Sequence, residues 1–351
     1  MNFEAMRVLD ESKMLGDLQA LGRHWRHATE IAEGVDLNDD LRGARQIVWG
    51  GMGGSAIGGD LLQATVGDEL GIPVIANRGY ELPAFVGPDT LVIAASYSGN
   101  TEETLSVVEQ AHKAGAKLLC MTTGGELLRI CRERGLSHIA IPGGLQPRCG
   151  VLYLFTPVLT ALARLGYLSA DRLRADGEET ATMLASKAES YGREDGEAAR
   201  LAYTLEGKMP VLYASSHVGA AVMRWQTQIN ENANMLLHYN LLPEMNHNEI
   251  VGWQHPAESI SNMHVLFLRD KDEHKRVGQR LDLTEKLLTA EGGAAGVTTV
   301  SSEGVSRMAR IFSLLILGDF TSYYLALLNG VDPSPVDRIE RFKKLLADMP
   351  R

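Results

Sequence analysis

Short runs of apolar residues alternate with amphipathic stretches through the first half of the chain. The runs predict strands at 47–49, 73–76, 90–95, 117–121 and 138–141, and the stretches between them predict helices at 56–66, 102–114 and 125–134. Strands that are apolar almost throughout are typical of a sheet buried on both faces. The pattern therefore predicts a parallel sheet covered by helices on both sides.

A second series with the same alternation fills the rest of the chain. Its predicted strands are 211–214, 265–268 and 298–300, and its helices are 218–233, 274–291, 305–328 and 336–347. Long helices are expected at 151–166 and 170–204, helical structure at 3–41, and a long polar loop at 234–252. Because 351 residues exceed one ordinary core, two domains are expected.

The predicted fold is α/β, with two doubly wound parallel-sheet domains and flanking helices. Its divisions are an N-terminal helical extension over 1–41, a first domain over 42–166, a helical connection over 167–206 and a second domain over 207–351.

The composition is that of an acidic globular chain, with 45% apolar and 22% charged residues. A net charge of −10 argues against a nucleic-acid partner. The longest apolar run, 311–318, ends at Asp319 and is too short to span a bilayer, so no membrane partner is expected. The N-terminus does not resemble a secretory signal. The cysteines are Cys120, Cys131 and Cys149. Because they lack the spacing of metal ligands, we expect the protein in the reducing cytoplasm.

Two turns rich in glycine and hydroxyl groups each follow a predicted strand and precede a helix, at 50–55 and 96–101. A loop that enters a helix N-terminus offers unpaired N–H groups and the positive end of the helix dipole, which suit an anion. Hydroxyl side chains add neutral donors. The hydroxyl residues of the two turns are Ser55, Ser96, Ser98 and Thr101. Two such turns in neighbouring βα units predict one phosphate site.

Two other interpretations of these turns stay open. Residues 51–56 fit the dinucleotide pattern G-x-G-x-x-A after a strand, which would indicate an NADP-dependent dehydrogenase. The acidic residue expected at the end of the next strand is missing, and Asn77 and Arg78 suit at most a 2′-phosphate. Alternatively, the glycines serve tight turns without any ligand.

Candidate groups for acid–base chemistry lie further along the chain. Arg148 follows the last strand of the first sheet, on the carboxyl-end side where such sheets bind ligands. The segment 228–249 gathers carboxylates and an imidazole among asparagines: Glu231, Glu244, His247 and Glu249. These groups suit proton transfer, or else a hydrogen-bonded loop or subunit contact. The H-N-E sequence at 247 is like that of zinc deaminases, but no P-C-x-x-C follows, and no metal is expected.

Three segments give the chain a specific resemblance. They are Gly-Met-Gly-Gly-Ser-Ala-Ile-Gly-Gly-Asp at 51–60, Ser-Tyr-Ser-Gly-Asn-Thr-Glu-Glu-Thr at 96–104 and Pro-Glu-Met-Asn-His-Asn-Glu at 243–249. In this order they resemble the bifunctional phosphoglucose/phosphomannose isomerase family, whose members carry two sugar-isomerase (SIS) domains. The resemblance covers nearly the whole chain and implies that both predicted domains are SIS domains.

The resemblance also implies how the substrate binds. The phosphate of the sugar would be held by the four hydroxyl residues Ser55, Ser96, Ser98 and Thr101. Gly53, Gly54 and Ser334 would lie against the substrate. Ser334 stands where a threonine is expected in relatives, and it keeps the hydroxyl group.

The resemblance assigns catalytic roles as well. Glu231 would be the base that moves the proton, and Arg148 would lie beside the reacting C1–C2 unit. His247 would assist ring opening from the neighbouring subunit of a homodimer with a shared active site. A C-terminal lysine would accompany His247, and Lys343 is preferred to Lys344.

The predicted reaction interconverts glucose 6-phosphate and mannose 6-phosphate with fructose 6-phosphate through a cis-enediol. A carboxylate can carry the proton and a guanidinium can stabilise the enediolate, so no metal or cofactor is expected. The alternative is a non-catalytic SIS module that senses a sugar phosphate. Such regulators usually carry a DNA-binding helix-turn-helix, and residues 1–45 lack a basic recognition helix.

Overall fold

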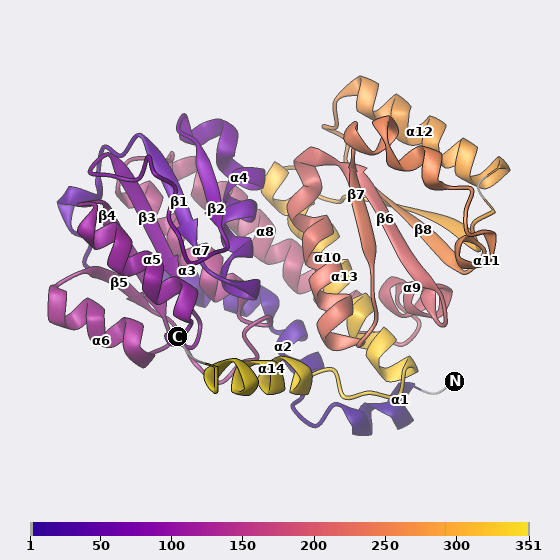
Figure 1. Cartoon of the computed structure of the whole chain (residues 1–351), viewed down its shortest axis with the longest axis horizontal. Coiled ribbons are helices and arrows are strands. Elements are labelled where there is room, and N and C mark those ends of the chain that lie inside the picture. Colours follow the sequence, from indigo (N-terminus) through magenta and orange to yellow (C-terminus); the bar gives the residue numbers. More distant parts are fainter. Residues whose placement is uncertain (1–2, 292, 350–351) are drawn as a thin grey trace.

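The chain folds into two α/β halves that lie side by side (Figure 1). The computed structural model describes residues 3–291 and 293–349, so the predicted divisions 1–41 and 207–351 include residues outside the described ranges. Each half is built on a parallel sheet, and the predicted α/β fold is thereby confirmed.

The first half contains a five-stranded sheet within the described residues. Its spatial order is β2 (Val74–Asn77), β1 (Gln46–Gly50), β3 (Thr90–Ala95), β4 (Lys117–Thr122) and β5 (Ser137–Ala140), and every neighbouring pair is parallel. Val92 and Cys120 point to the face covered by α5 (Glu102–Lys113) and α6 (Gly125–Arg134). Trp49 and Ile93 point to the opposite face, covered by α4 (Ile57–Leu70) and α7 (Val151–Arg164).

The second half contains a four-stranded parallel sheet in the described part of the chain. Its spatial order is β7 (His238–Leu242), β6 (Met209–Ser215), β8 (Met263–Arg269) and β9 (Gly296–Ser301). Tyr213 and Phe267 pack on α12 (Lys275–Ala290), whereas Leu212 and Leu266 face the shared core with α10 (Gly219–Asn232) and α13 (Arg307–Leu328).

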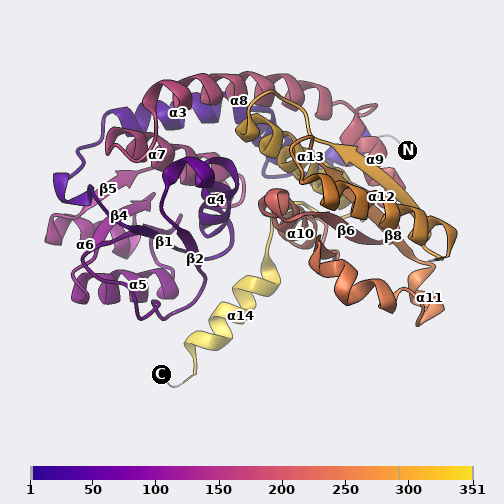
Figure 2. The same cartoon turned by 90° about the horizontal axis from the view of Figure 1, so that it is seen from above.

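Helix α13 lies at the centre of the shared core. By length and composition α13 could cross a membrane, because its apolar stretch is longer than the run 311–318 suggested. However, 94% of its most apolar 18-residue stretch is buried inside the protein. It packs against α10, α8 (Ala170–Tyr191) and α9 (Glu197–Leu205). Helix α8 extends over both halves (Figure 2), so α13 and α8 together tie the two sheets into one body.

The N-terminal helices belong to the same core. They are α1 (Phe3–Met6), α2 (Met14–Gln19) and α3 (Leu21–Glu33), and α3 packs between α7 and α8 with Trp25 almost fully buried. Asp10 accepts hydrogen bonds from the first N–H groups of α2, at 2.7 Å from Met14 and 3.0 Å from Leu15. The remaining elements are η1 (Arg7–Leu9), η2 (Asp39–Leu41), η3 (Gly53–Ser55), η4 (Ser216–Val218), η5 (Glu244–His247), η6 (Glu249–Gly252), α11 (Ala257–Ile260) and α14 (Asp337–Ala347).

Three predicted elements differ from the structure. The polar loop expected at 234–252 contains the strand β7, because an edge strand needs little apolar surface and polar side chains on it remain half exposed. The single helix expected at 170–204 is broken between Gly192 and Gly196 into α8 and α9. The helical stretch expected at 3–41 ends at Gly34, after which the chain is extended except for η2.

Candidate active site

The two hydroxyl-rich turns lie together at the carboxyl edge of the first sheet, after β1 and β3. The backbone N–H of Tyr97 donates to Ser55 Oγ at 3.2 Å, which joins one turn to the other. Within the second turn, Ser96 Oγ lies 2.9 Å from Thr101 Oγ1 and accepts from the N–H of Gly99 at 3.1 Å. The helices α4 and α5 begin just beyond, so their N-terminal N–H groups and these hydroxyls share one edge.

Two glycines allow the close approaches that this edge requires. Gly99 has φ +74°, and a Cβ there would lie 1.9 Å from the carbonyl oxygen of Gly124. A Cβ on Gly54 would lie 3.2 Å from the carbonyl oxygen of Pro147 and 3.4 Å from Cα of Arg148. The first turn and the Arg148 loop are therefore in contact at Gly54.

Arg148 is buried rather than solvated, with 3% of the residue exposed. Its Nε donates to Asn232 Oδ1 at 2.5 Å, and its Nη2 donates to the carbonyl oxygens of Pro333 and Ser334 at 2.6 and 2.7 Å. Nη1 lies 3.7 Å from Glu231 Oε2. Burial lowers the pKa of Arg148 and the Glu231 carboxylate opposes that shift, and a guanidinium keeps its charge at neutral pH.

Glu231 lies in the last turn of α10 and lines a cavity of about 830 Å³. Its side chain keeps 28% of its surface exposed, whereas that of Arg148 keeps 4%. The cavity is also lined by residues 331–332 and 335–339, which connect α13 to α14. Its volume suits a ligand of sugar-phosphate size, and its wall carries a carboxylate backed by a buried guanidinium.

His247 and Glu231 lie on opposite sides of β7 in the chain, with Glu231 at the end of α10 and His247 on η5. Helix α10 starts at the carboxyl edge of the second sheet and runs back towards the opposite edge, and Glu231 lies near its end. Strand β7 then runs to the carboxyl edge, where η5 carries His247. His247 is exposed. The described residues that line the cavity of Glu231 do not include His247.

The loop that carries His247 is anchored through Glu249. The Glu249 carboxylate accepts from His238 Nε2 at 2.8 Å, from Asn240 Nδ2 at 2.6 Å and from the Tyr213 hydroxyl. Burial alone would raise the pKa of Glu249, but these hydrogen bonds lower it below its ordinary value. The bond to Glu249 raises the pKa of His238.

Lys343 and Lys344 lie on α14, which projects from the body of the protein (Figure 2). In the described chain α14 buries no side chain, and neither lysine forms a hydrogen bond or ion pair. One side of α14 is apolar and largely exposed: Ile339, Phe342, Leu345 and Leu346. The start of α14 lines the cavity of Glu231, whereas Lys343, one turn further along, is not among the described residues that line it.

Ser334 is almost fully buried beside Arg148. Its carbonyl oxygen holds Arg148 Nη2, as described above, while its Oγ is buried and has no hydrogen-bond partner among the described residues. The Ser334 hydroxyl is thus near the guanidinium but covered.

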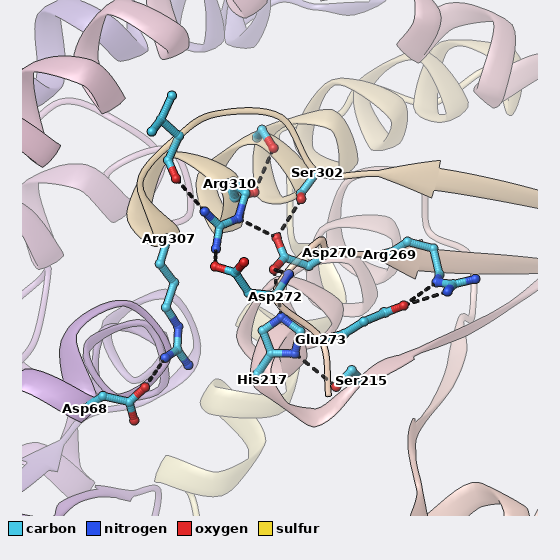
Figure 3. A network of polar contacts seen from close by, with 12 residues as sticks. Asp68, Ser215, His217, Arg269, Asp270, Asp272, Glu273, Ser302, Arg307 and Arg310 are labelled. Atoms are coloured by element: carbon cyan, nitrogen blue, oxygen red, sulfur yellow. Dashed lines mark hydrogen bonds and ion pairs between the residues drawn. The ribbon is translucent and has the colours of Figure 1, made fainter. Parts of the chain in front are cut away.

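The carboxyl edge of the second sheet also carries hydroxyl groups, on Ser215 and Ser216, but Ser215 Oγ is bonded to His217 Nδ1 at 3.0 Å. Asp270 directly follows β8, as Ser96 directly follows β3. Its carboxylate accepts from His217 Nε2 at 3.0 Å, Ser302 Oγ at 2.6 Å and Arg310 Nε at 2.9 Å (Figure 3). Burial alone would raise the pKa of Asp270, but these bonds hold it well below its usual range. Asp272 also pairs with Arg310, and Glu273 pairs with Arg269, so the charged groups of this edge are engaged with one another.

Sequence reasoning missed the buried groups that hold Arg148. Arg224 forms a two-bond ion pair with Asp319 at 2.9 and 3.0 Å, and Arg224 Nη2 also donates to the carbonyl oxygen of Arg148 at 2.6 Å. Asn232 belongs to the same group. Their spacing could have indicated them, because Arg224, Gln228 and Asn232 recur every four residues and so share one otherwise largely apolar face of the helix.

Among the residues that the structure describes, no group of three or more His, Cys, Asp and Glu side chains is arranged to hold a metal ion. The three cysteines are free and buried. Burial raises the pKa of the Cys149 thiol to about 12, so this neighbour of Arg148 is a neutral thiol at physiological pH.

Comparison with known proteins agrees with this geometry. A model of the SIS domain matches residues 40–141, and a model described as the bacterial phospho-glucose isomerase C-terminal SIS domain matches residues 194–346. A hypothetical protein from Thermus thermophilus has the same fold, with a TM-score of 0.75 at 17% identity over 98% of this chain and 93% of that one. The chain is thus a tandem SIS-domain protein.

Sequence relatives narrow the class. The chain is 42% identical to the bifunctional phosphoglucose/phosphomannose isomerase of Caldicellulosiruptor bescii, over 92% of this chain and 95% of the relative. It is 37% identical to the protein of the same name from Aquifex aeolicus, over 90% and 94%. The chain belongs to the bifunctional phosphoglucose/phosphomannose isomerase family.

Proposed function

We propose that this chain interconverts glucose 6-phosphate and mannose 6-phosphate with fructose 6-phosphate, without a metal or cofactor. The observation that carries the proposal is the pairing of Glu231, which lines a cavity, with a buried Arg148 whose loop contacts the first hydroxyl turn at Gly54. The relatives named above are bifunctional isomerases of these two sugars. A sugar-phosphate sensor would need neither a base nor a buried guanidinium beside it.

Glu231 carries the proton in this mechanism. As a carboxylate it removes the C2 proton of the open-chain aldose and returns it to C1 on the same face of a cis-enediol. The negative charge that develops on the enediolate oxygens is stabilised by Arg148 Nη1, because the other two guanidinium nitrogens are already bonded to protein oxygens.

The phosphate is held at the edge of the first sheet. Hydroxyls of Ser55, Ser96, Ser98 and Thr101 and N–H groups beside Gly53 and Gly54 are its donors. Ser334 is small and its hydroxyl is covered beside Arg148, so in this proposal it does not intrude on C2, and both epimers are accepted after rotation about C2–C3. On this account kcat/KM values for the two aldoses lie within about 10²-fold of each other.

His247 and Lys343 act across a homodimer. His247 does not line the cavity of Glu231 in its own chain, so in this proposal it serves the neighbouring subunit's site and assists ring opening there. The exposed apolar side of α14 supports a second copy as its packing partner, with Lys343 carried to the shared site. The proposed divisions of the chain are 1–41, 42–166, 167–206 and 207–351, and the proposed location is the cytoplasm.

The test is a coupled assay with purified protein in EDTA. Fructose 6-phosphate is expected to yield both aldose phosphates, and failure to yield either refutes the proposal. Mixing inactive Glu231→Gln with inactive His247→Ala subunits is expected to restore activity, because some hybrid sites receive both native groups. No recovery after verified subunit exchange would exclude the shared site while leaving the isomerase assignment in place.

A further inference from the structure

A stripe of polar residues is buried between α10 and α13. Arg224, Gln228 and Asn232 each expose 1% or less of their surface. They face α13, where Asp319 and Ser322 are equally buried. Burying polar side chains at a helix–helix contact is costly unless their hydrogen bonds are made, so a stripe of this kind marks a constraint other than packing.

The amide of Asn232 has a defined orientation. Ser322 Oγ donates to the carbonyl oxygen of Asp319 at 2.7 Å, which leaves it as an acceptor for Asn232 Nδ2 at 2.9 Å. The amide oxygen must therefore point the other way, towards Arg148 Nε at 2.5 Å. A chain of three hydrogen bonds thus runs from the backbone of α13 to the guanidinium.

The guanidinium that donates this bond is held on two sides. Nε is bonded to Asn232, and both N–H groups of Nη2 are occupied by the carbonyls of Pro333 and Ser334. Within the described residues Nη1 makes no hydrogen bond, and its neighbour is Glu231 at 3.7 Å. A planar guanidinium fixed at Nε and Nη2 has no rotational freedom left, so the direction of Nη1 is set.

We propose that Asn232 is the positioning residue for Arg148: it directs Nη1 to the oxygens of the enediolate beside Glu231. Asn232 follows Glu231 directly on α10, so one helix end carries the base and orients the stabilising cation. Arg224, fixed by Asp319, supports the same loop by holding the carbonyl of Arg148. The inference rests on the proposed isomerase function and adds a residue that does not contact the substrate.

The test compares Asn232→Leu with Asn232→Asp. Leucine has a similar size but no acceptor, whereas aspartate keeps an oxygen facing Nε. Misdirecting one transition-state donor is expected to lower kcat of Asn232→Leu by about 30-fold to 100-fold, with KM changed by less than about threefold. Asn232→Asp is expected to retain several-fold more of kcat than Asn232→Leu.

Asn329→Leu is the matched control. Asn329 Nδ2 donates to the carbonyl of Ala233 at 2.9 Å, so its loss also removes an amide contact between α13 and the end of α10, without touching Arg148. Its kcat is expected to stay within about twofold of the wild type. Urea unfolding of all variants separates a loss of folding from a loss of turnover.

The binding of two inhibitors provides a second test that does not depend on turnover. An aldonohydroxamate phosphate carries the planar anionic unit of the enediolate, whereas glucitol 6-phosphate resembles the open-chain ground state. Asn232→Leu is expected to weaken binding of the hydroxamate at least about tenfold more than binding of glucitol 6-phosphate. Equal weakening of both, or an unchanged kcat, overturns the inference. Inactivity of the wild-type protein would instead overturn the proposed function.

Discussion

Replacing Arg148 with lysine keeps the positive charge of this side chain and tests whether the hydrogen-bond geometry of the guanidinium is needed. The guanidinium makes hydrogen bonds to three oxygens, on Asn232, Pro333 and Ser334, and leaves Nη1 for the reaction. An ammonium is a point charge and cannot reproduce this fork. If the ammonium stays with the three oxygens, it no longer reaches the enediolate; if it turns towards Glu231, buried oxygens lose their donor, at about 1–3 kcal/mol each.

The expected kinetic cost follows from the first of these outcomes. Losing one preorganised donor to a developing oxyanion costs about 10²-fold to 10³-fold in kcat, or about 3–4 kcal/mol. KM for fructose 6-phosphate is expected to change by less than about threefold, because the phosphate turns are intact. Steady-state assays in both directions measure the two constants.

Arg164→Lys is the control for this substitution. Arg164 Nη1 also bridges two backbone carbonyls, of Ala32 at 2.6 Å and Val35 at 2.7 Å, but it lies on α7 outside the proposed site. Its kcat is expected to match the wild type. If Arg148→Lys keeps more than about a tenth of the wild-type kcat while remaining folded, then Arg148 does not stabilise the transition state.

Three further results are expected. Ser96→Ala combined with Ser98→Ala is expected to raise KM for fructose 6-phosphate by about 10-fold to 100-fold, since the two lost hydrogen bonds together are worth about 1–3 kcal/mol, and an unchanged KM would remove these hydroxyls from the phosphate site. The pKa of His238 is raised above 6.5 and that of Glu249 lowered below 4.5, so their pairing contributes fully between these two values and is lost as pH rises through the raised His238 pKa. The loss of urea stability in His238→Gln should therefore be larger at pH 6 than at pH 9, and an equal loss would contradict the assigned pairing. Because the Cys149 pKa is about 12, iodoacetamide at pH 8 is expected to leave Cys149 unmodified in the folded enzyme, as read by peptide mass spectrometry; rapid labelling would show that it is accessible as a thiolate.

Local patterns were sufficient to predict most of the strands, the helices around them and the two turns. Apolar runs such as 90–95 are long enough to identify a buried strand, and glycine with serine directly after a strand indicates a turn at a helix N-terminus. The strand β7 was missed because His238, Tyr239 and Asn240 do not form an apolar run; β7 is defined by its pairing with β6.

The buried polar groups could not be predicted in the same way. Arg224, Asn232 and Asp319 appear in the sequence as ordinary polar residues, and Asp319 simply ends an apolar run. Their partners lie 76 to 95 positions away in the chain, so the contacts exist only after α10 has packed on α13 and the Arg148 loop. Position after a strand pointed to Arg148, but its burial and its three oxygen partners follow from tertiary structure alone.

The central claim is that Glu231 moves a proton between C1 and C2, and solvent deuterium tests it most directly. Fructose 6-phosphate is incubated with the purified protein in D₂O with EDTA, and the products are followed by NMR. The account predicts glucose 6-phosphate and mannose 6-phosphate that carry deuterium at C2, and a loss of at least about 10²-fold in rate for Glu231→Gln. Near-normal turnover by folded Glu231→Gln would contradict it.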